Sequence, residues 1–163
     1  MLDLNKLEAI VFDFDGVLTD NKVFVDQEGN EMVCCHRADG LAFDFLRKTS
    51  LKLFILSTET NMVVARRGEK LKIPVYQGFK EKAQALKMLS KEQNFTLSKT
   101  LFIGNDLNDY SAIKTCGFSA CPSDSHPEIL KIATIHLKTQ GGQGIVRELV
   151  EHIFGMDGLK LIS

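Results

Sequence analysis

The sequence predicts an α/β fold built on a parallel sheet that helices cover on both faces. The run Ala9-Ile10-Val11-Phe12 is apolar throughout, which indicates a strand buried on both faces. Similar runs recur over residues 51–56 and 100–103, with helix-like stretches between them. Asp13 and Asp15 directly follow the first run. Ligands bind beyond the carboxyl ends of strands in open parallel sheets, so we expect function there.

Length and composition narrow the class of protein. At 163 residues the chain is expected to form a single domain over 1–163, which buries about two-thirds of its unfolded surface. Its 20 Lys and Arg against 21 Asp and Glu leave a net charge of −1, so no partner nucleic acid or membrane is expected. No apolar run could span a bilayer and no signal peptide is evident, which favours a cytoplasmic protein.

The four cysteines follow no metal or disulfide pattern. They do not form two C-x-x-C pairs, so neither a zinc site nor a disulfide framework is expected. We expect reduced, mostly buried thiols at Cys34, Cys35, Cys116 and Cys121.

Asp13 and Asp15 are spaced so that both carboxylates point broadly the same way. Crowded like charges raise a pKa unless a positive charge is shared between them. Mg²⁺ takes oxygen ligands and often binds through one or two carboxylates plus phosphate oxygens. Gly16 then allows the chain to turn away sharply. The alternative is that both acids are ordinary turn residues, and D-x-D-G by itself does not decide between the two.

Two short β-prone runs, 22–25 and 31–35, flank the polar, glycine-containing stretch 26–30 and predict a hairpin. An isolated two-stranded ribbon is only marginally stable, so its apolar side needs a cover. The cover is either the domain itself or another subunit, and we favour an oligomer contact.

The next segment predicts a helix over 40–48 with Asp39 as its N-cap, then a strand over 51–56 and a helix over 61–71. Ser57 and Thr58 stand where that strand ends. A hydroxyl beside unpaired N–H groups is suited to bind an anion, although either residue could instead only cap the helix.

A short strand within 74–78 precedes an amphipathic helix over 80–93. Lys80, Lys82 and Lys87 are candidates for pairing with phosphate, but lysines on such a helix are usually solvated. The residues alone do not single out one of them.

The strand 100–103 also ends in acids, within Gly104-Asn105-Asp106-Leu107-Asn108-Asp109. Helix capping would explain Asp106 and Asp109. Because two acidic strand ends can share one metal ion, we favour a role of these acids at or around a metal.

The rest of the chain predicts strands over 117–120 and 133–136 with a short helix between them. Gly141-Gly142-Gln143-Gly144 opens a helix over 145–154, and these glycines either articulate that helix or form a mobile loop near an active site. Residues 155–163 are expected to be a loosely held tail.

Four elements in this order resemble the haloacid dehalogenase-like (HAD) phosphatases over essentially the whole chain. They are D-x-D-G-V-L-T-D, the Ser/Thr strand end, the helical lysine and G-N-D-L-N-D. The resemblance is to the capless 3-deoxy-D-manno-octulosonate 8-phosphate phosphatase-like subgroup, to nonulosonate 9-phosphate phosphatases and to the carboxy-terminal domain of CMP-sialate synthetases. It implies a HAD-like Rossmannoid three-layer sandwich, with the hairpin extension of about 22–35 in place of a cap domain.

The resemblance also implies roles at matching positions. Asp13 becomes the nucleophile and Asp15 the general acid and base, while Lys82 holds phosphate and nucleophile together. Phosphate or substrate binding falls to Ser57, Thr58 and Gly16. Mg²⁺ would be held by Asp13, Asp15, Asn105 and Asp106, with Asp109 supporting these ligands.

Three arginines are further candidates for substrate binding, and this prediction comes from the residue type and not from the resemblance. Arg67, together with Arg66 and Arg147, could pair in bidentate fashion with a substrate carboxylate, unless it is simply solvated at the surface.

Two positions depart from the family pattern. Asn105 stands where an Asp is usual, which keeps a coordinating oxygen but removes its charge. Ser57-Thr58 replaces the common Thr-Gly, which keeps the hydroxyl and loses the glycine.

We therefore predict a Mg²⁺-dependent phosphatase that acts on a 3-deoxy-2-keto sugar acid phosphate through an aspartyl phosphate. Because the chain has no cap-sized insertion, a homotetramer is expected to cover the site. The alternatives are a weakly active or inactive oligomerisation domain associated with CMP-sugar acid synthesis, and a response-regulator receiver, in which the acids lie on different strands.

Overall fold

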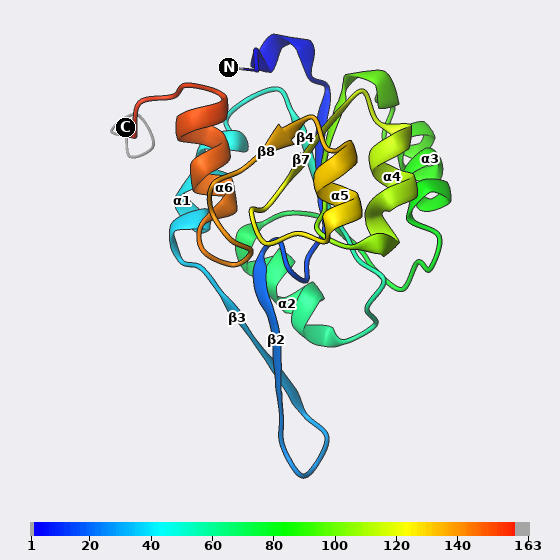
Figure 1. Ribbon diagram of the computed structural model, residues 1–163, viewed down its shortest axis with the longest axis vertical. Coiled ribbons are helices and arrows are strands. Elements are labelled where there is room, and N and C mark those ends of the chain that lie inside the picture. Colours follow the sequence, from blue (N-terminus) through cyan, green and yellow to red (C-terminus); the bar gives the residue numbers. More distant parts are fainter. Residues whose placement is uncertain (1, 159–163) are drawn as a thin grey trace.

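The computed structural model describes residues 2–158, whose core is a six-stranded parallel sheet (Figure 1). The strand order is β5-β4-β1-β6-β7-β8. The strands are β1 Ala9–Phe12, β4 Lys52–Leu56, β5 Val75–Tyr76, β6 Thr100–Ile103, β7 Phe118–Cys121 and β8 Ile135–His136. Strand β1 pairs on both sides, so Phe12 lies beside Ile55 and Ile103. The chain reverses its direction of growth at β1, and such a switch point is where open α/β sheets bind ligands.

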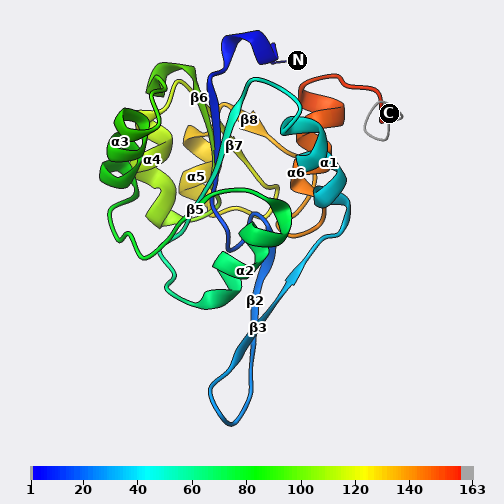
Figure 2. The same cartoon turned by 180° about the vertical axis from the view of Figure 1, so that it is seen from behind.

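Helices cover both faces of the sheet and give three layers (Figures 1 and 2). Ile10 and Phe12 point to one face and pack with α1 Ala38–Leu46, α2 Met62–Leu71 and α6 Ile145–Glu148. Ala9 and Val11 point to the other. The helices there are α3 Lys82–Glu92, α4 Tyr110–Thr115 and α5 Pro127–Ile132. Side chains that alternate along a strand therefore fill two separate cores, as predicted for a strand buried on both faces.

The predicted hairpin is present and projects away from the sheet (Figure 1). Strands β2 Thr19–Val25 and β3 Glu31–Cys35 pair antiparallel, with an irregular register between Thr19 and Val23. Its apolar side chains are exposed at Val23, Phe24, Val25 and Met32. The body of the chain described here does not cover them.

The sequence-based assignment of Asp39 as an N-cap was wrong. Helix α1 begins at Ala38, with Arg37 in the N-cap position, so Asp39 lies inside the first turn. Its carboxylate instead accepts hydrogen bonds from the backbone N–H groups of Val146 and Arg147. The residue does cap a helix, but that helix is α6, far away in the sequence.

Helix boundaries differ in three further places, and the first is the end of α1, at Leu46 and not at residue 48. Helix α3 begins at Lys82 and not at residue 80, which puts Lys82 at its first position. The predicted helix over 145–154 changes hydrogen-bonding pattern after α6, because Leu149–Ile153 forms a π-helical turn. π-Helical turns of this kind insert an extra residue into a helix.

Of the four free cysteines, only Cys121 is buried, so the expectation of mostly buried thiols was wrong; Cys34 lies exposed on β3. Of the predicted loose tail, Met156 packs on the core and its N–H donates to Val150 O, while residues 159–163 lie outside the described residues. Within residues 2–158, no helix combines the length and apolarity that crossing a membrane requires.

Candidate active site

Asp13 lies directly beyond strand β1, at the switch point of the sheet. Its N–H donates to Ile103 O at 2.8 Å, which continues the β1–β6 ladder by one residue. Its carboxylate accepts the N–H of Phe14 at 2.7 Å, and the residue is 4% exposed. A buried strand end thus fixes the backbone and holds one carboxylate oxygen.

The side chain of Lys82 forms an ion pair with the carboxylate of Asp13. Its Nζ lies 2.7 Å from Asp13 Oδ1 and 2.6 Å from Asp109 Oδ1, and no part of its side chain is exposed. Burial lowers the pKa of Lys82, but the two carboxylates raise it by more, so the lysine stays charged. Burial and the charge of Asp109 raise the pKa of Asp13, and Lys82 opposes both effects. The predicted pairing of Lys82 with Asp13 is present.

Asp15 lies in a less buried position, beside the turn that follows β1. Burial raises the pKa of its carboxyl; the hydroxyl of Thr19, 3.3 Å from Asp15 Oδ1, lowers it, and the charge of Glu59 raises it further. A raised pKa keeps a carboxyl protonated closer to neutral pH, which suits a proton donor. Asp13 and Asp15 therefore occupy environments that differ in burial and in charge partners.

The loop after β6 is organised by Asp109. Its Oδ2 accepts the N–H groups of Asn105 at 2.9 Å and Asp106 at 3.3 Å, while Oδ1 binds Lys82. A Cβ added to Gly104 would lie 2.6 Å from Asp109 Cγ, so only glycine leaves room there. Asp106 also caps the following turn by accepting the N–H of Leu107 at 2.7 Å. Capping and site formation therefore use the same acids.

Ser57 lies 1% exposed at the end of β4, and its hydroxyl accepts the N–H of Glu59 at 3.1 Å. The cap of helix α2 is Asn61, whose side chain accepts the N–H of Val63. Neither Ser57 nor Thr58 is therefore used as a cap. Both residues line the cavity beyond the strand ends, where the Thr58 hydroxyl accepts the side-chain N–H of Asn108 at 3.5 Å.

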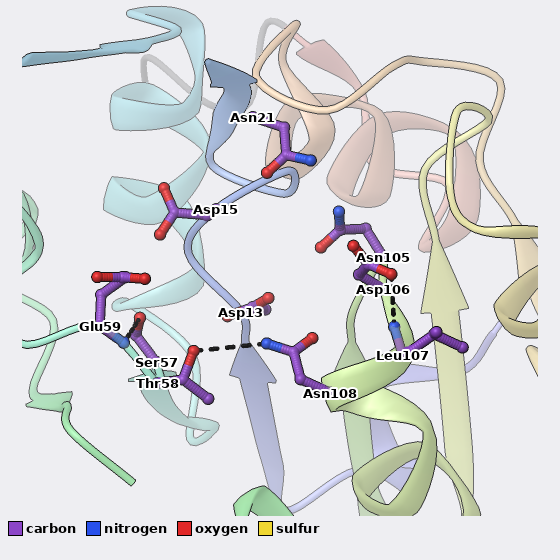
Figure 3. A pocket seen from close by; sticks show the side chains of 10 residues that line it. All are labelled: Asp13, Asp15, Asn21, Ser57, Thr58, Glu59, Asn105, Asp106, Leu107 and Asn108. Atoms are coloured by element: carbon purple, nitrogen blue, oxygen red, sulfur yellow. Dashed lines mark hydrogen bonds between the residues drawn. The ribbon is translucent and has the colours of Figure 1, made fainter. Parts of the chain in front are cut away.

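These side chains surround one cavity of about 310 Å³ (Figure 3). Figure 3 shows Asp15 and residues 57–59 on one side, Asn105 to Asn108 on the other, and Asp13 between them. Four of its lining residues were not predicted as site residues from the sequence: Asn21, Glu59, Leu107 and Asn108. Only Asn21 has a local signal, a left-handed backbone (φ 61°) that Asn adopts more readily than most residues.

Two of the residues predicted to bind phosphate or substrate, Gly16 and Arg67, are not among the residues that line this cavity. Gly16 approaches the site through its backbone, because a Cβ there would lie 2.0 Å from Asn105 Nδ2. Arg67 does not reach the cavity within one copy of the chain. Its guanidinium donates to His36 O at 3.0 Å and lines a separate cavity of about 370 Å³. Arg66 and Arg147 form ion pairs with Glu69 and Glu151.

The electrostatics of the cavity favour a cation. Four acids line it, Asp13, Asp15, Glu59 and Asp106, and no Lys or Arg is among its lining residues. In residues 2–158, no three His, Cys, Asp or Glu side chains are already close enough to form a metal cluster. The Oδ1 of Asn105, however, is buried without a hydrogen-bond partner. A hard cation such as Mg²⁺ prefers such an oxygen together with carboxylates, so the donor set fits one.

The arrangement is suited to phosphoryl transfer. A buried carboxylate paired with a lysine can act as a nucleophile, and a second carboxyl with a raised pKa can donate a proton. The hydroxyls of Ser57 and Thr58, at the end of β4, can bind phosphate oxygens.

Comparisons with known proteins agree with this chemistry. The model of the haloacid dehalogenase-like hydrolase family matches residues 56–149. The 3-deoxy-D-manno-octulosonate 8-phosphate phosphatase of Haemophilus influenzae is 32% identical over 157 residues, covering 95% of this chain and 87% of that relative. The N-acylneuraminate cytidylyltransferase A of Danio rerio is 25% identical over 90% of this chain, which corresponds to 35% of that relative.

A solved structure extends the likeness to the fold. It is the 3-deoxy-D-manno-octulosonate 8-phosphate phosphatase from Moraxella catarrhalis, in complex with a magnesium ion, a phosphate ion and 3-deoxy-D-manno-octulosonate (KDO). The TM-score is 0.88 at 29% identity, over 93% of this chain and 88% of that chain.

The chain therefore belongs to the haloacid dehalogenase-like hydrolases. This excludes the receiver domain, and the strand order differs from a receiver's as well. Within the family the chain is a phosphatase, similar to the 3-deoxy-D-manno-octulosonate 8-phosphate phosphatases.

Proposed function

We propose that this phosphatase hydrolyses the phosphomonoester of a 3-deoxy-2-keto sugar acid, with Asp13 as the nucleophile and Asp15 as the general acid and base. The observation that carries the proposal is the pairing of buried Asp13 with Lys82 at 2.7 Å, at the base of a cavity that Asp15 also lines. Nucleophile, counter-charge and proton donor thus come from adjacent parts of one site.

In the first step an Asp13 carboxylate oxygen attacks phosphorus and the bond from phosphorus to the sugar oxygen breaks. Asp15 gives its proton to that departing oxygen, so the sugar acid leaves as an alcohol. Lys82 stays charged beside Asp13 and offsets negative charge as it builds up. The Ser57 and Thr58 hydroxyls, which line the cavity, hold the phosphoryl oxygens.

In the second step Asp15, now ionised, takes a proton from water while the water oxygen attacks the aspartyl phosphate. The bond between phosphorus and Asp13 breaks, inorganic phosphate leaves, and both aspartates return to their starting states. The raised pKa of Asp15, caused mainly by burial, suits both directions of proton transfer.

Asp13, Asp15, Asn105 and Asp106 are the residues proposed to hold Mg²⁺, with Asp15 contributing its backbone carbonyl oxygen so that its carboxyl keeps the proton it donates. When bound, the ion supplies positive charge that lets a phosphate dianion enter a cavity lined by four acids. The orphaned Asn105 Oδ1 supports this assignment. The substrate class rests on the relatives, since the Moraxella structure is named as a complex with magnesium, phosphate and KDO.

The nonulosonate 9-phosphates belong to the same proposed substrate class, because they share the 2-keto acid end and the primary phosphate ester. We further propose that the chain works as one cytoplasmic domain in a homotetramer. The exposed hairpin residues Phe24 and Met32, each 62% exposed, support assembly through the hairpins.

The test is phosphate release from 3-deoxy-octulosonate 8-phosphate and nonulosonate 9-phosphates with Mg²⁺, for wild type beside Asp13→Asn. Turnover by the wild type alone would support phosphatase action through Asp13, and the best substrate would identify the sugar acid. Turnover that persists in Asp13→Asn would rule out the covalent route through this residue.

A second candidate is a weakly active domain that serves mainly in oligomerisation. The uncharged Asn105 and the similarity to part of a cytidylyltransferase favour it. Absence of turnover on every sugar phosphate, at saturating Mg²⁺ and with an intact oligomer, would support this candidate over the phosphatase.

A further inference from the structure

The segment Gly141–Gly144 lies backbone to backbone on the turn that follows Asp15. The N–H of Gly142 donates to Val17 O at 3.0 Å. A Cβ on Gly141 would lie 2.1 Å from Gly16 O, and one on Gly142 would lie 2.3 Å from Asp20 N. Side chains are therefore excluded at both positions, and the segment covers the turn of its own subunit.

The covered turn holds the Asp15 side chain in place by means of the Thr19 hydroxyl. The buried hydroxyl of Thr19 donates to Asp15 Oδ1 at 3.3 Å and accepts the N–H of Gly16 at 3.2 Å. It also accepts the N–H of Asn21 at 3.2 Å. Because one hydroxyl joins the start and end of the turn to the Asp15 carboxylate, a shift of the turn also moves that carboxylate.

Asp39 holds the glycine segment from its other end. Helix α6 follows Gly144, which has a left-handed backbone (φ 99°) and offers no side-chain cap. Asp39 supplies the missing acceptor, because its Oδ1 receives the N–H groups of Val146 at 2.9 Å and Arg147 at 3.2 Å. This fixes the residues that come directly after the glycines.

The contact of Asp39 with helix α6 requires a buried carboxyl group, which costs free energy of folding. The residue is 1% exposed, and its Oδ2 is buried with no hydrogen-bond partner. Burying a carboxylate with incomplete hydrogen bonding costs free energy, which a local cap on α6 would avoid. The gain from this placement is a fixed connection between α1 and the glycine segment.

We propose that Asp39 is a positioning residue: by anchoring α6 it keeps Gly141–Gly144 on the turn and thereby keeps the Asp15 carboxyl aligned with the departing oxygen. This inference rests on the proposed function. It concerns the first step, in which the bond from Asp13 to phosphorus forms, the bond to the sugar oxygen breaks, and the Asp15 proton moves to that oxygen.

The test compares a sugar phosphate with p-nitrophenyl phosphate. The sugar alkoxide needs a proton in order to leave, whereas p-nitrophenolate leaves without one. The parameter kcat/KM covers only the steps up to phosphoryl transfer, so it isolates the proton donation. We expect Asp39→Ala to lower kcat/KM for the sugar phosphate about tenfold or more, within the range for general acids, with a change below about threefold for the aryl ester.

Variants separate positioning from stability. Asp39→Asn keeps an acceptor oxygen for Val146 and Arg147, so it should recover most of the lost selectivity. Thr134→Val removes a hydrogen bond to Ser119 O at the far edge of the sheet, and should lower stability without changing the substrate ratio. If Asp39→Ala does not fold, Gly142→Ala displaces the same turn and should give the same selective loss.

An equal loss on both substrates in Asp39→Ala and Gly142→Ala would overturn the positioning role. Asp15→Asn distinguishes this failure from failure of the proposed function. If Asp15→Asn leaves the substrate ratio unchanged, the proposed role of Asp15 is wrong and the positioning role falls with it. If Asp15→Asn changes the substrate ratio while Asp39→Ala and Gly142→Ala leave the ratio unchanged, the proposed function stands and the positioning role is wrong.

Discussion

Lys82 Nζ lies 2.7 Å from Asp13 Oδ1, and both side chains are buried at the base of the candidate site. A third group completes the arrangement, because Asp109 binds the same ammonium at 2.6 Å. One cation therefore stands between two carboxylates that come from different strand ends. We therefore expect removal of the Lys82 ammonium to lower both the stability of the fold and the phosphatase activity.

Lys82→Met should leave two buried carboxylates without their shared counter-charge. Breaking a buried ion pair by removing one partner typically costs about 3–5 kcal/mol, so we expect a loss of that order in the free energy of unfolding. Phosphatase activity should fall about 100-fold or more, since stabilisation of transition-state charge is lost. Urea unfolding and phosphate release measure the two effects.

The matched control is Lys87→Met, on the same helix but with an exposed side chain. It removes an equal charge and should change neither stability nor activity appreciably. Equal effects of the two substitutions would mean that the buried contacts of Lys82 are not what matters.

Glu59→Gln should move the alkaline limb of kcat/KM to lower pH. The charge of Glu59 contributes to raising the pKa of Asp15, after the larger effect of burial. Without that charge the pKa of Asp15 falls, so less of the protonated general acid remains at a given alkaline pH. The measurement is a pH profile of kcat/KM for a sugar phosphate.

A control for this profile is Glu69→Gln, at an exposed position where Glu69 pairs with Arg66. It removes the same charge away from Asp15 and should leave the profile in place. A limb that stays fixed in Glu59→Gln would show that the charge of Glu59 does not set the ionisation of the general acid.

Asn105→Asp should strengthen Mg²⁺ binding and weaken the metal-free protein. The new carboxylate would replace a buried amide oxygen that has no hydrogen-bond partner. Ligand charge tunes the affinity of hard cations, and we expect tightening by about tenfold. Without metal the added charge lies near Asp13 and should lower the melting temperature, so the thermal shift on adding Mg²⁺ should grow.

Asn108→Asp is the control, because it adds the same charge at an exposed residue that lines the same cavity. It should give a smaller Mg²⁺-dependent shift. Metal binding by Asn105→Asp that is no tighter than in the wild type would argue against coordination through this side chain.

Phe24→Glu should dissociate the proposed homotetramer. Phe24 is 62% exposed on the projecting hairpin, and a charge there would have to be buried in any hairpin interface. Light scattering measures the mass, and activity measured alongside shows whether the site needs neighbouring subunits. Met88→Glu, at a residue 58% exposed on α3, is the control and should keep the wild-type mass.

A wild type that is monomeric and fully active would contradict the assembly proposal. A tetramer that survives Phe24→Glu would contradict the role of the hairpin in it.

The sequence by itself determined the sheet, the hairpin and the acids at the strand ends. Strand β1 spans the predicted apolar run. The sequence becomes polar directly after the strand, at Asp13 and Asp15. These features depend on local patterns: apolar runs, turn residues and caps are read within a few neighbouring positions. The motifs at these strand ends also resemble those of the family to which the chain belongs.

Only the tertiary structure decided which distant groups meet. The contact of Lys82 with Asp109 spans 27 residues, and that of Asp39 with Val146 spans 107. The local pattern around Asp39 predicted a cap on α1, and the packing of α1 against α6 overrode it. The fold likewise brought Glu59 into the cavity and left Arg67 outside it. Burial and partners depend on how layers pack, which no local pattern specifies.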